Sequence, residues 1–80
     1  MKLPRSVSGA DMVKALKRLD YEVTGQTGSH IRLTLKQPKQ HHVTIPNHDP
    51  IKVGTLAAIV AEVSTQLDIP RDVLVHKLFG

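Results

Sequence analysis

The clearest alternation of polar and apolar residues in the chain runs through residues 29–36. From His30 onward the two kinds alternate without a break, with Ile31, Leu33 and Leu35 as the apolar positions. Side chains on a β-strand point alternately to opposite faces, so this pattern predicts a strand with one buried face and one solvent-exposed face. The exposed face is predicted to carry His30, Arg32, Thr34 and Lys36.

Two more strands are expected, one on each side of this strand in the sequence. Residues 21–24 favour β structure, and a reversal at 25–28 joins them to the central strand as a hairpin. After a proline-marked turn, residues 41–45 form the third strand, which Pro46 ends. The third strand is expected to turn Val43 and Ile45 toward the core and His42 and Thr44 toward solvent.

The segments around the strands have the spacing of amphipathic helices. Ser8 and Asp11 fit an N-terminal capping box, and a helical stripe follows at Met12, Val13, Leu16 and Leu19. A second helix is expected to begin at Gly54-Thr55 with Thr55 as its cap, and its stripe comprises Leu56, Ile59, Val60, Val63 and Leu67. Pro70 suits the start of a short helix over 71–78 that offers three residues for packing: Val73, Leu74 and Phe79.

This order of elements predicts an α+β fold. We expect a two-layer α-β-β-β-α sandwich with a three-stranded antiparallel sheet, helices on one face and a short extra C-terminal helix. The chain of 80 residues is expected to form one domain over 1–80, with a loose leader at 1–7 and a C-terminal helical extension at 70–80. The sheet face that carries His30 is then left open.

Composition narrows the classes of function. The formal net charge is +4, which is typical either of a protein with a polyanionic partner or of a generic basic surface. Tyr21 and Phe79 are the only aromatic residues, too few for recognition of stacked bases. Without cysteine there is no disulfide, thiol nucleophile or cysteine-based zinc site. No apolar run could span a membrane and no signal peptide is evident, so we expect a soluble, cytoplasmic protein without membrane contact.

Several short motifs, taken in order, point to a known family. They are Val13-Lys14-Ala15-Leu16, Tyr21, Gly28-Ser29-His30, Val43-Thr44-Ile45-Pro46 and Lys52-Val53-Gly54-Thr55-Leu56. From about Ser8 to Ile69 the chain resembles the HicA-type toxins, also called the YcfA-like family, of bacterial and archaeal toxin–antitoxin pairs. The resemblance implies a fold similar to the double-stranded RNA-binding domain. It also implies metal-independent cleavage of mRNA and silencing by a HicB antitoxin.

The same resemblance makes His30 the catalytic residue. Two positions depart from the family pattern: Asp20 stands where several members carry glycine, and Gly25 where many carry arginine. If that arginine binds RNA or the antitoxin, its absence would weaken the interaction. The antitoxin is expected to cover His30, which would block catalysis and neutralise the basic face.

RNA cleavage without a metal or other cofactor requires proton transfer from the 2′-OH and to the leaving 5′ oxygen, and an imidazole can do either near neutral pH. We therefore expect His30 to act as general acid or base, with His42 on the same face as a possible second proton-transfer group. No role is assigned to His41, His48 or His76, and a zinc site built from His30, His41, His42 and His48 lacks a metal-ligand spacing motif. The predicted RNA-binding residues are Gly28, Ser29, Arg32, Thr34, Lys36, His42 and Lys52.

Two other functions stay open at this point. The domain could bind RNA through phosphate contacts without cleaving it, or it could be a module that docks an acidic, antitoxin-like protein. His30 would then be an exposed strand residue with no chemical task. Binding that survives replacement of His30 would distinguish the non-catalytic RNA binder from the nuclease.

Overall fold

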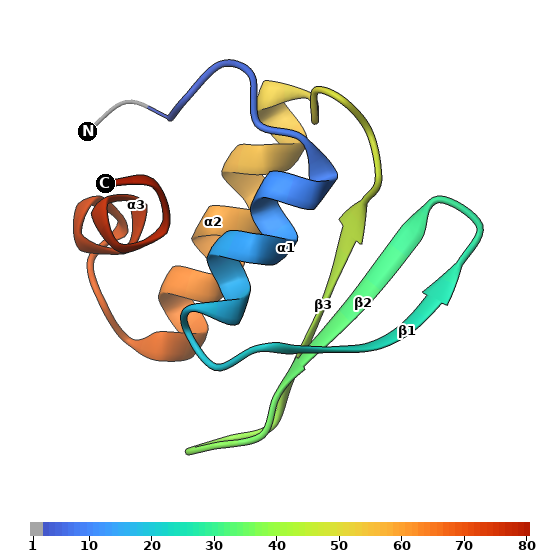
Figure 1. Ribbon diagram of the computed structural model, residues 1–80. Coiled ribbons are helices and arrows are strands. Elements are labelled where there is room, and N and C mark those ends of the chain that lie inside the picture. Colours follow the sequence, from blue (N-terminus) through green and yellow to red (C-terminus); the bar gives the residue numbers. More distant parts are fainter. Residues whose placement is uncertain (1–2) are drawn as a thin grey trace.

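A computed structural model describes residues 3–80, which form an α+β fold of one open sheet and three helices (Figure 1). The predicted fold class and the short C-terminal helix are confirmed. In chain order the elements are α1 (Gly9–Lys17), β1 (Glu22–Thr27), β2 (His30–Leu35), β3 (His41–Pro46), α2 (Val53–Leu67) and α3 (Arg71–Phe79).

The sheet is an antiparallel meander in the order β1-β2-β3, as predicted. The hairpin turn is shorter than the expected reversal at 25–28, because Thr27 already pairs with His30. Only Gly28 and Ser29 lie between the two strands, and Gly28 has a φ of +57°, where glycine is favoured. Val23 pairs with Leu33 and Gly25 pairs with Arg32, so β1 has one more residue than β2 at this point and forms a β-bulge.

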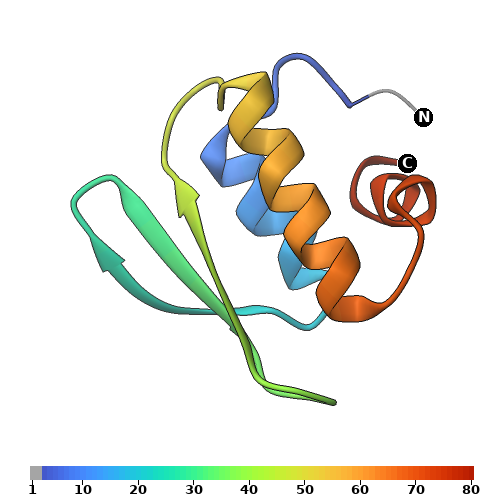
Figure 2. The same cartoon turned by 180° about the vertical axis from the view of Figure 1, so that it is seen from behind.

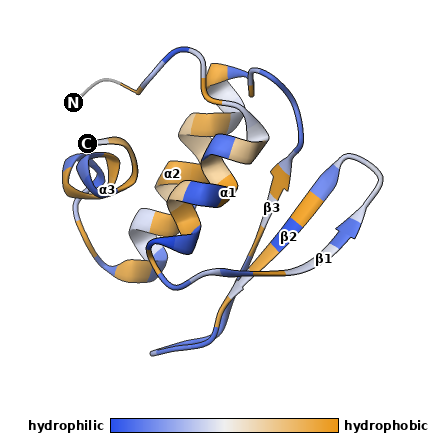
Figure 3. Ribbon diagram, viewed as in Figure 1, coloured by the Kyte–Doolittle hydropathy of each residue, from blue (hydrophilic) through white to orange (hydrophobic). Residues whose placement is uncertain are grey.

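The helices α1 and α2 lie against one face of the sheet, and α3 lies on the opposite side of this helix pair (Figures 1 and 2). Polar and apolar residues alternate along β2 (Figure 3), and the apolar ones lie in the hydrophobic core or pack against it. Four of the residues predicted to face the core from the sheet are buried: Leu33, Leu35, Val43 and Ile45. Burial of this apolar layer is the main source of stability.

The starts of α1 and α2 differ in how they are capped. The predicted capping box is confirmed: the Ser8 hydroxyl accepts a hydrogen bond from the Asp11 N–H at 3.0 Å, and the Asp11 carboxylate accepts one from the Ser8 N–H at 3.1 Å. The expectation that Thr55 caps α2 is wrong. Lys52 holds the cap position, no side chain caps the helix, and Thr55 lies within the first turn.

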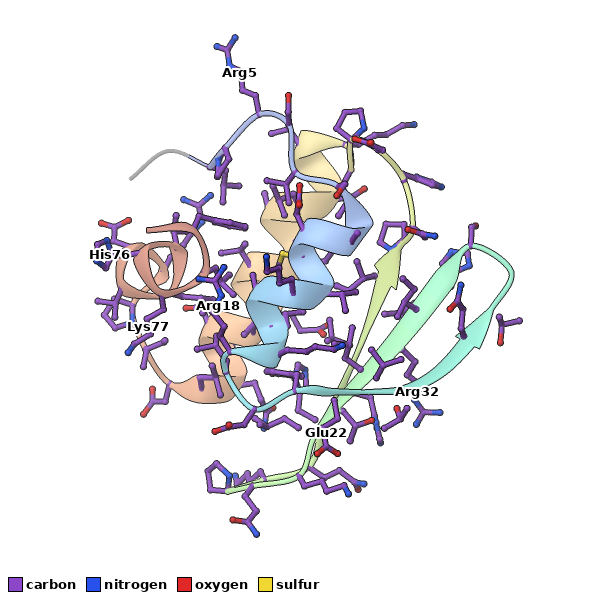
Figure 4. All side chains as sticks on the ribbon, viewed as in Figure 1. Arg5, Arg18, Glu22, Arg32, His76 and Lys77 are labelled. Carbon is purple, nitrogen blue, oxygen red and sulfur yellow. The ribbon has the colours of Figure 1, made fainter. Side chains whose placement is uncertain are left out.

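The third helix packs differently from the expectation. Leu74 is buried as predicted, together with Val75 and Leu78, whereas Val73 is 43% exposed. The prediction for Val73 is therefore wrong, because α3 turns the face bearing residues 74, 75 and 78 toward α1 and α2. His76 and Lys77 point outward from α3 (Figure 4).

The segment before α1 also contributes to the core. Residues 1–2 of the predicted loose leader lie outside the described residues, but Val7 is buried and its carbonyl accepts a hydrogen bond from the Ile51 N–H at 2.8 Å. Leu3 is partly buried against the same core. Between residues 3 and 80, none of the helices has the length and apolar character needed to cross a membrane.

Tyr21, in the short connection between α1 and β1, is buried in the core. Its hydroxyl lies 2.7 Å from His41 Nδ1, and His41 Nε2 lies 3.2 Å from the Glu62 carboxylate on α2. Because a carboxylate only accepts, the tautomer of His41 that satisfies both contacts donates from Nε2 to Glu62 and accepts the Tyr21 O–H at Nδ1. Burial, and secondarily the negative charge of Glu62, raise the pKa of Tyr21 to about 12.

This raised pKa predicts a loss of stability in alkali. An unfolded chain loses the tyrosine proton near its ordinary pKa of 10, so between pH 10 and 12 the unfolded state binds fewer protons than the folded one. The free energy of unfolding should therefore fall by about 3 kcal/mol across that window, and below pH 10 it should not change through this group. The chain has one tyrosine and no tryptophan, so phenolate absorbance reports Tyr21 alone.

Urea unfolding of wild type and Tyr21→Phe at pH 9 and pH 11.5 measures this effect, since lysine titration affects both proteins alike. The wild type should lose more stability than the variant on going to the higher pH. A phenolate midpoint near 10 in the folded protein would contradict the prediction.

Candidate active site

His30 is placed by the β1–β2 hairpin turn. It is the first residue of β2, directly after Gly28 and Ser29, and its side chain is exposed. On the other side it pairs with Pro46, the last residue of β3. The Ser29 carbonyl accepts a hydrogen bond from the Asn47 N–H at 2.6 Å, which ties the turn to the segment that follows β3. The position of His30 is thus fixed from two strands.

His30 opens into a cavity of about 400 Å³ between the end of the sheet and the start of α2. The cavity is lined by residues from β2, β3, the loop after β3 and α2: His30, Thr44, Pro46, His48, Lys52 and Thr55. Its lining has two imidazoles and one ammonium group but no carboxylate. A cavity with these groups suits an anionic ligand.

The first turn of α2 adds to this positive character. The helix has no side-chain cap and no acidic residue in its first turn, so backbone N–H groups there are free for a ligand. The N-terminal end of a helix also carries partial positive charge, which favours an anion. Gly54 in this turn has open space around its Cα, so a ligand can approach the backbone closely.

Arg32 lies beside His30 on the open face of the sheet. The two residues are separated by one position, which places their side chains roughly 7 Å apart along the strand. Figure 4 shows Arg32 directed away from the helices. Its partner on β1 is Gly25, where the resembling family often carries arginine and where space for a side chain is open. Arg32 is therefore the cation of this open face closest to His30 along β2.

Thr34 does not reach the surface. It is only 4% exposed, so the prediction that it faces solvent is wrong. Its hydroxyl lies 2.8 Å from Thr24 Oγ1 on β1 and 2.8 Å from His42 Nδ1 on β3. A small side chain in the central strand is covered by its neighbours on both sides, because the sheet has a strand on each flank.

His42 and Lys36 lie farther along the sheet than the prediction of one common site requires. His42 pairs with Thr34, four residues from His30, which corresponds to about 13 Å along the strand. Lys36 follows β2 at the opposite end from His30, about 20 Å away along the strand, and forms an exposed ion pair with Glu22 at 3.6 Å. The structure thus brings Gly28, Ser29, Arg32 and Lys52 near His30 but leaves His42 and Lys36 apart.

A second cavity of about 420 Å³ lies between α1 and the β1–β2 hairpin. It is lined by apolar and amide side chains together with Lys14 and Lys17, and it includes none of the predicted site residues. It lacks a group suited to proton transfer near neutral pH, so the cavity at His30 is the better candidate for chemistry. Among residues 3–80, no group of three or more His, Asp or Glu side chains is arranged as metal ligands.

Comparison with known protein families identifies the chain. The family model described as "HicA toxin of bacterial toxin-antitoxin" matches residues 9–69, well over half of the sequence. The chain belongs to the HicA toxin family. Comparisons with curated proteins and with solved structures each gave no significant match. Membership of the HicA toxin family makes the chain part of a toxin–antitoxin system and implies a partner antitoxin.

The matched region contains every residue that lines the cavity at His30. It also contains one residue for which the sequence analysis predicts no role: His48 lines the same cavity as His30 and Lys52. His48 lies in an irregular loop, where neither strand alternation nor helical spacing applies. The only sequence signal was its place between Ile45-Pro46 and Lys52-Val53-Gly54, two of the motifs that resemble HicA toxins.

Proposed function

We propose that this chain is the toxin of a HicA/HicB-type pair and cleaves mRNA as a metal-independent ribonuclease, with His30 as general acid or base. The observation that carries the proposal is the cavity in which His30 meets Lys52 and the uncapped N-terminus of α2, in a chain of the HicA toxin family. An imidazole supplies proton transfer, and the cationic wall offers a place for the scissile phosphate.

The basic groups around His30 have distinct tasks in this proposal. Lys52 and the first N–H groups of α2 bind non-bridging oxygens of the phosphate, where negative charge grows as the crowded intermediate forms. Arg32 holds a neighbouring phosphate of the RNA on the open sheet face. Gly28 and Ser29 form a narrow turn that lets the backbone come close to His30.

Cleavage of RNA by the purified protein in the presence of EDTA tests the proposal. We expect His30→Ala to lower the single-turnover rate by about 10²–10⁴-fold, because the variant lacks the proton-transfer group. His76→Ala is the matched control, since His76 is an exposed histidine on α3, on the far side of the helices from the sheet. Far-UV circular dichroism checks that all three proteins are folded.

Equal cleavage by wild type and His30→Ala would contradict this function. If neither protein cleaves RNA but both bind it, the domain is a non-catalytic RNA binder that uses phosphate contacts. The proposal also has the antitoxin, HicB-like in kind, cover the mouth of the His30 cavity. Adding such an antitoxin should then suppress cleavage in the same assay.

A further inference from the structure

His48 is held beside His30 by the backbone on both of its sides. The preceding residue, Asn47, donates its N–H to the Ser29 carbonyl at 2.6 Å, and the His48 carbonyl accepts from the Gly9 N–H at 2.8 Å. The first bond joins the loop to the turn that carries His30, and the second anchors it to the start of α1. Both imidazoles line the cavity of about 400 Å³.

The other three histidines are engaged or distant. His41 lies between Tyr21 and Glu62, and His42 bonds to Thr34 about 13 Å along the sheet from His30. His76 is on α3, which packs on the side of α1 and α2 away from the sheet. Of the five histidines in the chain, all within the described residues, His48 alone shares a cavity with His30.

Cleavage of RNA by its own 2′-OH needs two proton transfers at opposite sides of one phosphorus. The 2′ oxygen forms a bond to phosphorus while its proton moves to a basic nitrogen. The bond from phosphorus to the 5′ oxygen breaks, and that oxygen takes a proton from an acidic N–H. The products are a 2′,3′-cyclic phosphate and a 5′-hydroxyl, with no change of oxidation state. One histidine serves only one of these transfers in a given turnover.

We propose that His48 is the second proton-transfer residue of the cleavage site, paired with His30 across the bound phosphate. This inference rests on the proposed ribonuclease function. Lys52, the remaining titratable group in the cavity lining, lies at the start of α2 and is assigned in the proposed function to the phosphate's non-bridging oxygens. His48 takes the role first predicted for His42, because the register of β2 and β3 places His42 opposite Thr34 and Pro46 opposite His30.

The pH dependence of single-turnover cleavage tests this pairing. Wild type should give a bell-shaped profile, since one imidazole must be neutral and the other protonated. His48→Ala should lower the maximal rate about 10²–10⁴-fold and remove one limb of the bell, as His30→Ala removes the other. His48→Gln serves as a second variant that keeps a polar side chain, and His76→Ala should match wild type.

An RNA with sulfur in place of the leaving 5′ oxygen separates the two roles. A thiolate leaves without being protonated, so the variant that lacks the acid should recover on this substrate, and the variant that lacks the base should not. Recovery of one of the two variants, His30→Ala or His48→Ala, supports the pairing and assigns the acid.

The proposal and the function on which it rests fail in different ways. If wild type does not cleave RNA, the proposed ribonuclease function is wrong. If wild type cleaves, His30→Ala does not, and His48→Ala keeps both limbs and a rate within about threefold, the function stands and the pairing is overturned. A raised KM with unchanged kcat in His48→Ala would also overturn the pairing. So would a pH profile that loses one limb in His42→Ala and not in His48→Ala.

Discussion

Replacing Gly9 with alanine is expected to destabilise the protein and to slow RNA cleavage together. Gly9 begins α1 against the chain that leaves β3, and a Cβ there would lie 2.6 Å from the Pro46 carbonyl oxygen and 2.7 Å from Asn47 Cα. Both are backbone atoms, so no side-chain rotation relieves the contact. Overpacking of this kind costs about 1–3 kcal/mol, and the segment that carries His48 must move.

Displacement of that segment has a second consequence for activity. The Gly9 N–H donates to the His48 carbonyl, and the Asn47 N–H donates to Ser29 beside His30. A shift of about 1 Å in a catalytic geometry lowers rates by up to 10²-fold, so cleavage by Gly9→Ala should fall more than its folded fraction does. Urea unfolding and single-turnover cleavage below the unfolding transition measure the two effects.

Gly54→Ala is the matched control for stability. A Cβ at Gly54 meets nothing within 4 Å, and the residue lies in α2, where alanine is preferred over glycine by up to about 1 kcal/mol. The two substitutions should therefore shift the urea midpoint in opposite directions. A Gly9→Ala protein as stable as wild type would show that the contact between β3 and α1 is looser than these distances indicate.

Replacing Leu74 with alanine is expected to cause a larger loss of stability than replacing Gly9. Leu74 is fully buried where α3 packs against α1 and α2, and Leu→Ala changes at such sites cost about 2–5 kcal/mol. A chain of this length has a total stability of roughly 4–12 kcal/mol, so a large share of it is at stake. The residue lies beyond the region matched by the HicA toxin family, which ends at residue 69.

The neighbouring Val73→Ala substitution provides the comparison. Val73 is on the same helix but is exposed, so its truncation should change the free energy of unfolding by less than about 0.5 kcal/mol. Thermal or urea unfolding of both variants gives the difference directly. A similar loss of unfolding free energy in Leu74→Ala and Val73→Ala would mean that the face of α3 bearing Leu74 does not pack against the core.

Much of the fold could be predicted because the signals were local. The alternation from His30 to Leu35 identified β2, and Ser8 with Asp11 marked the start of α1 through their reciprocal hydrogen bonds. Apolar spacing found the buried face of α2 from Leu56 to Val63. Each of these patterns reflects the side-chain period or the cap of a single helix or strand. It can therefore be recognised without knowing which elements pack against it.

The predictions of burial were wrong at positions where an adjacent strand or helix determines whether a side chain is covered. Alternation put Thr34 on the open face, but Thr24 and His42 from the adjacent strands cover it. Helical spacing predicted that Val73 packs in the core. Because of the way α3 lies against α1 and α2, Val75 and Leu78 are buried instead. Burial at these positions depends on tertiary contacts that no single segment encodes.

The sequence by itself determined the class of fold, the strand that carries His30 and the resemblance to HicA toxins, because these depend on residue order and short-range geometry. Only the tertiary structure decided which groups meet at His30. The register of β2 and β3 places His42 opposite Thr34, far from His30. The loop after β3 is hydrogen-bonded to Gly9 and Ser29 and places His48 in the same cavity as His30. A loop lacks the regular side-chain spacing of a helix or strand, so its sequence does not predict where its side chains point. Their positions depend on the long-range hydrogen bonds that anchor the loop backbone.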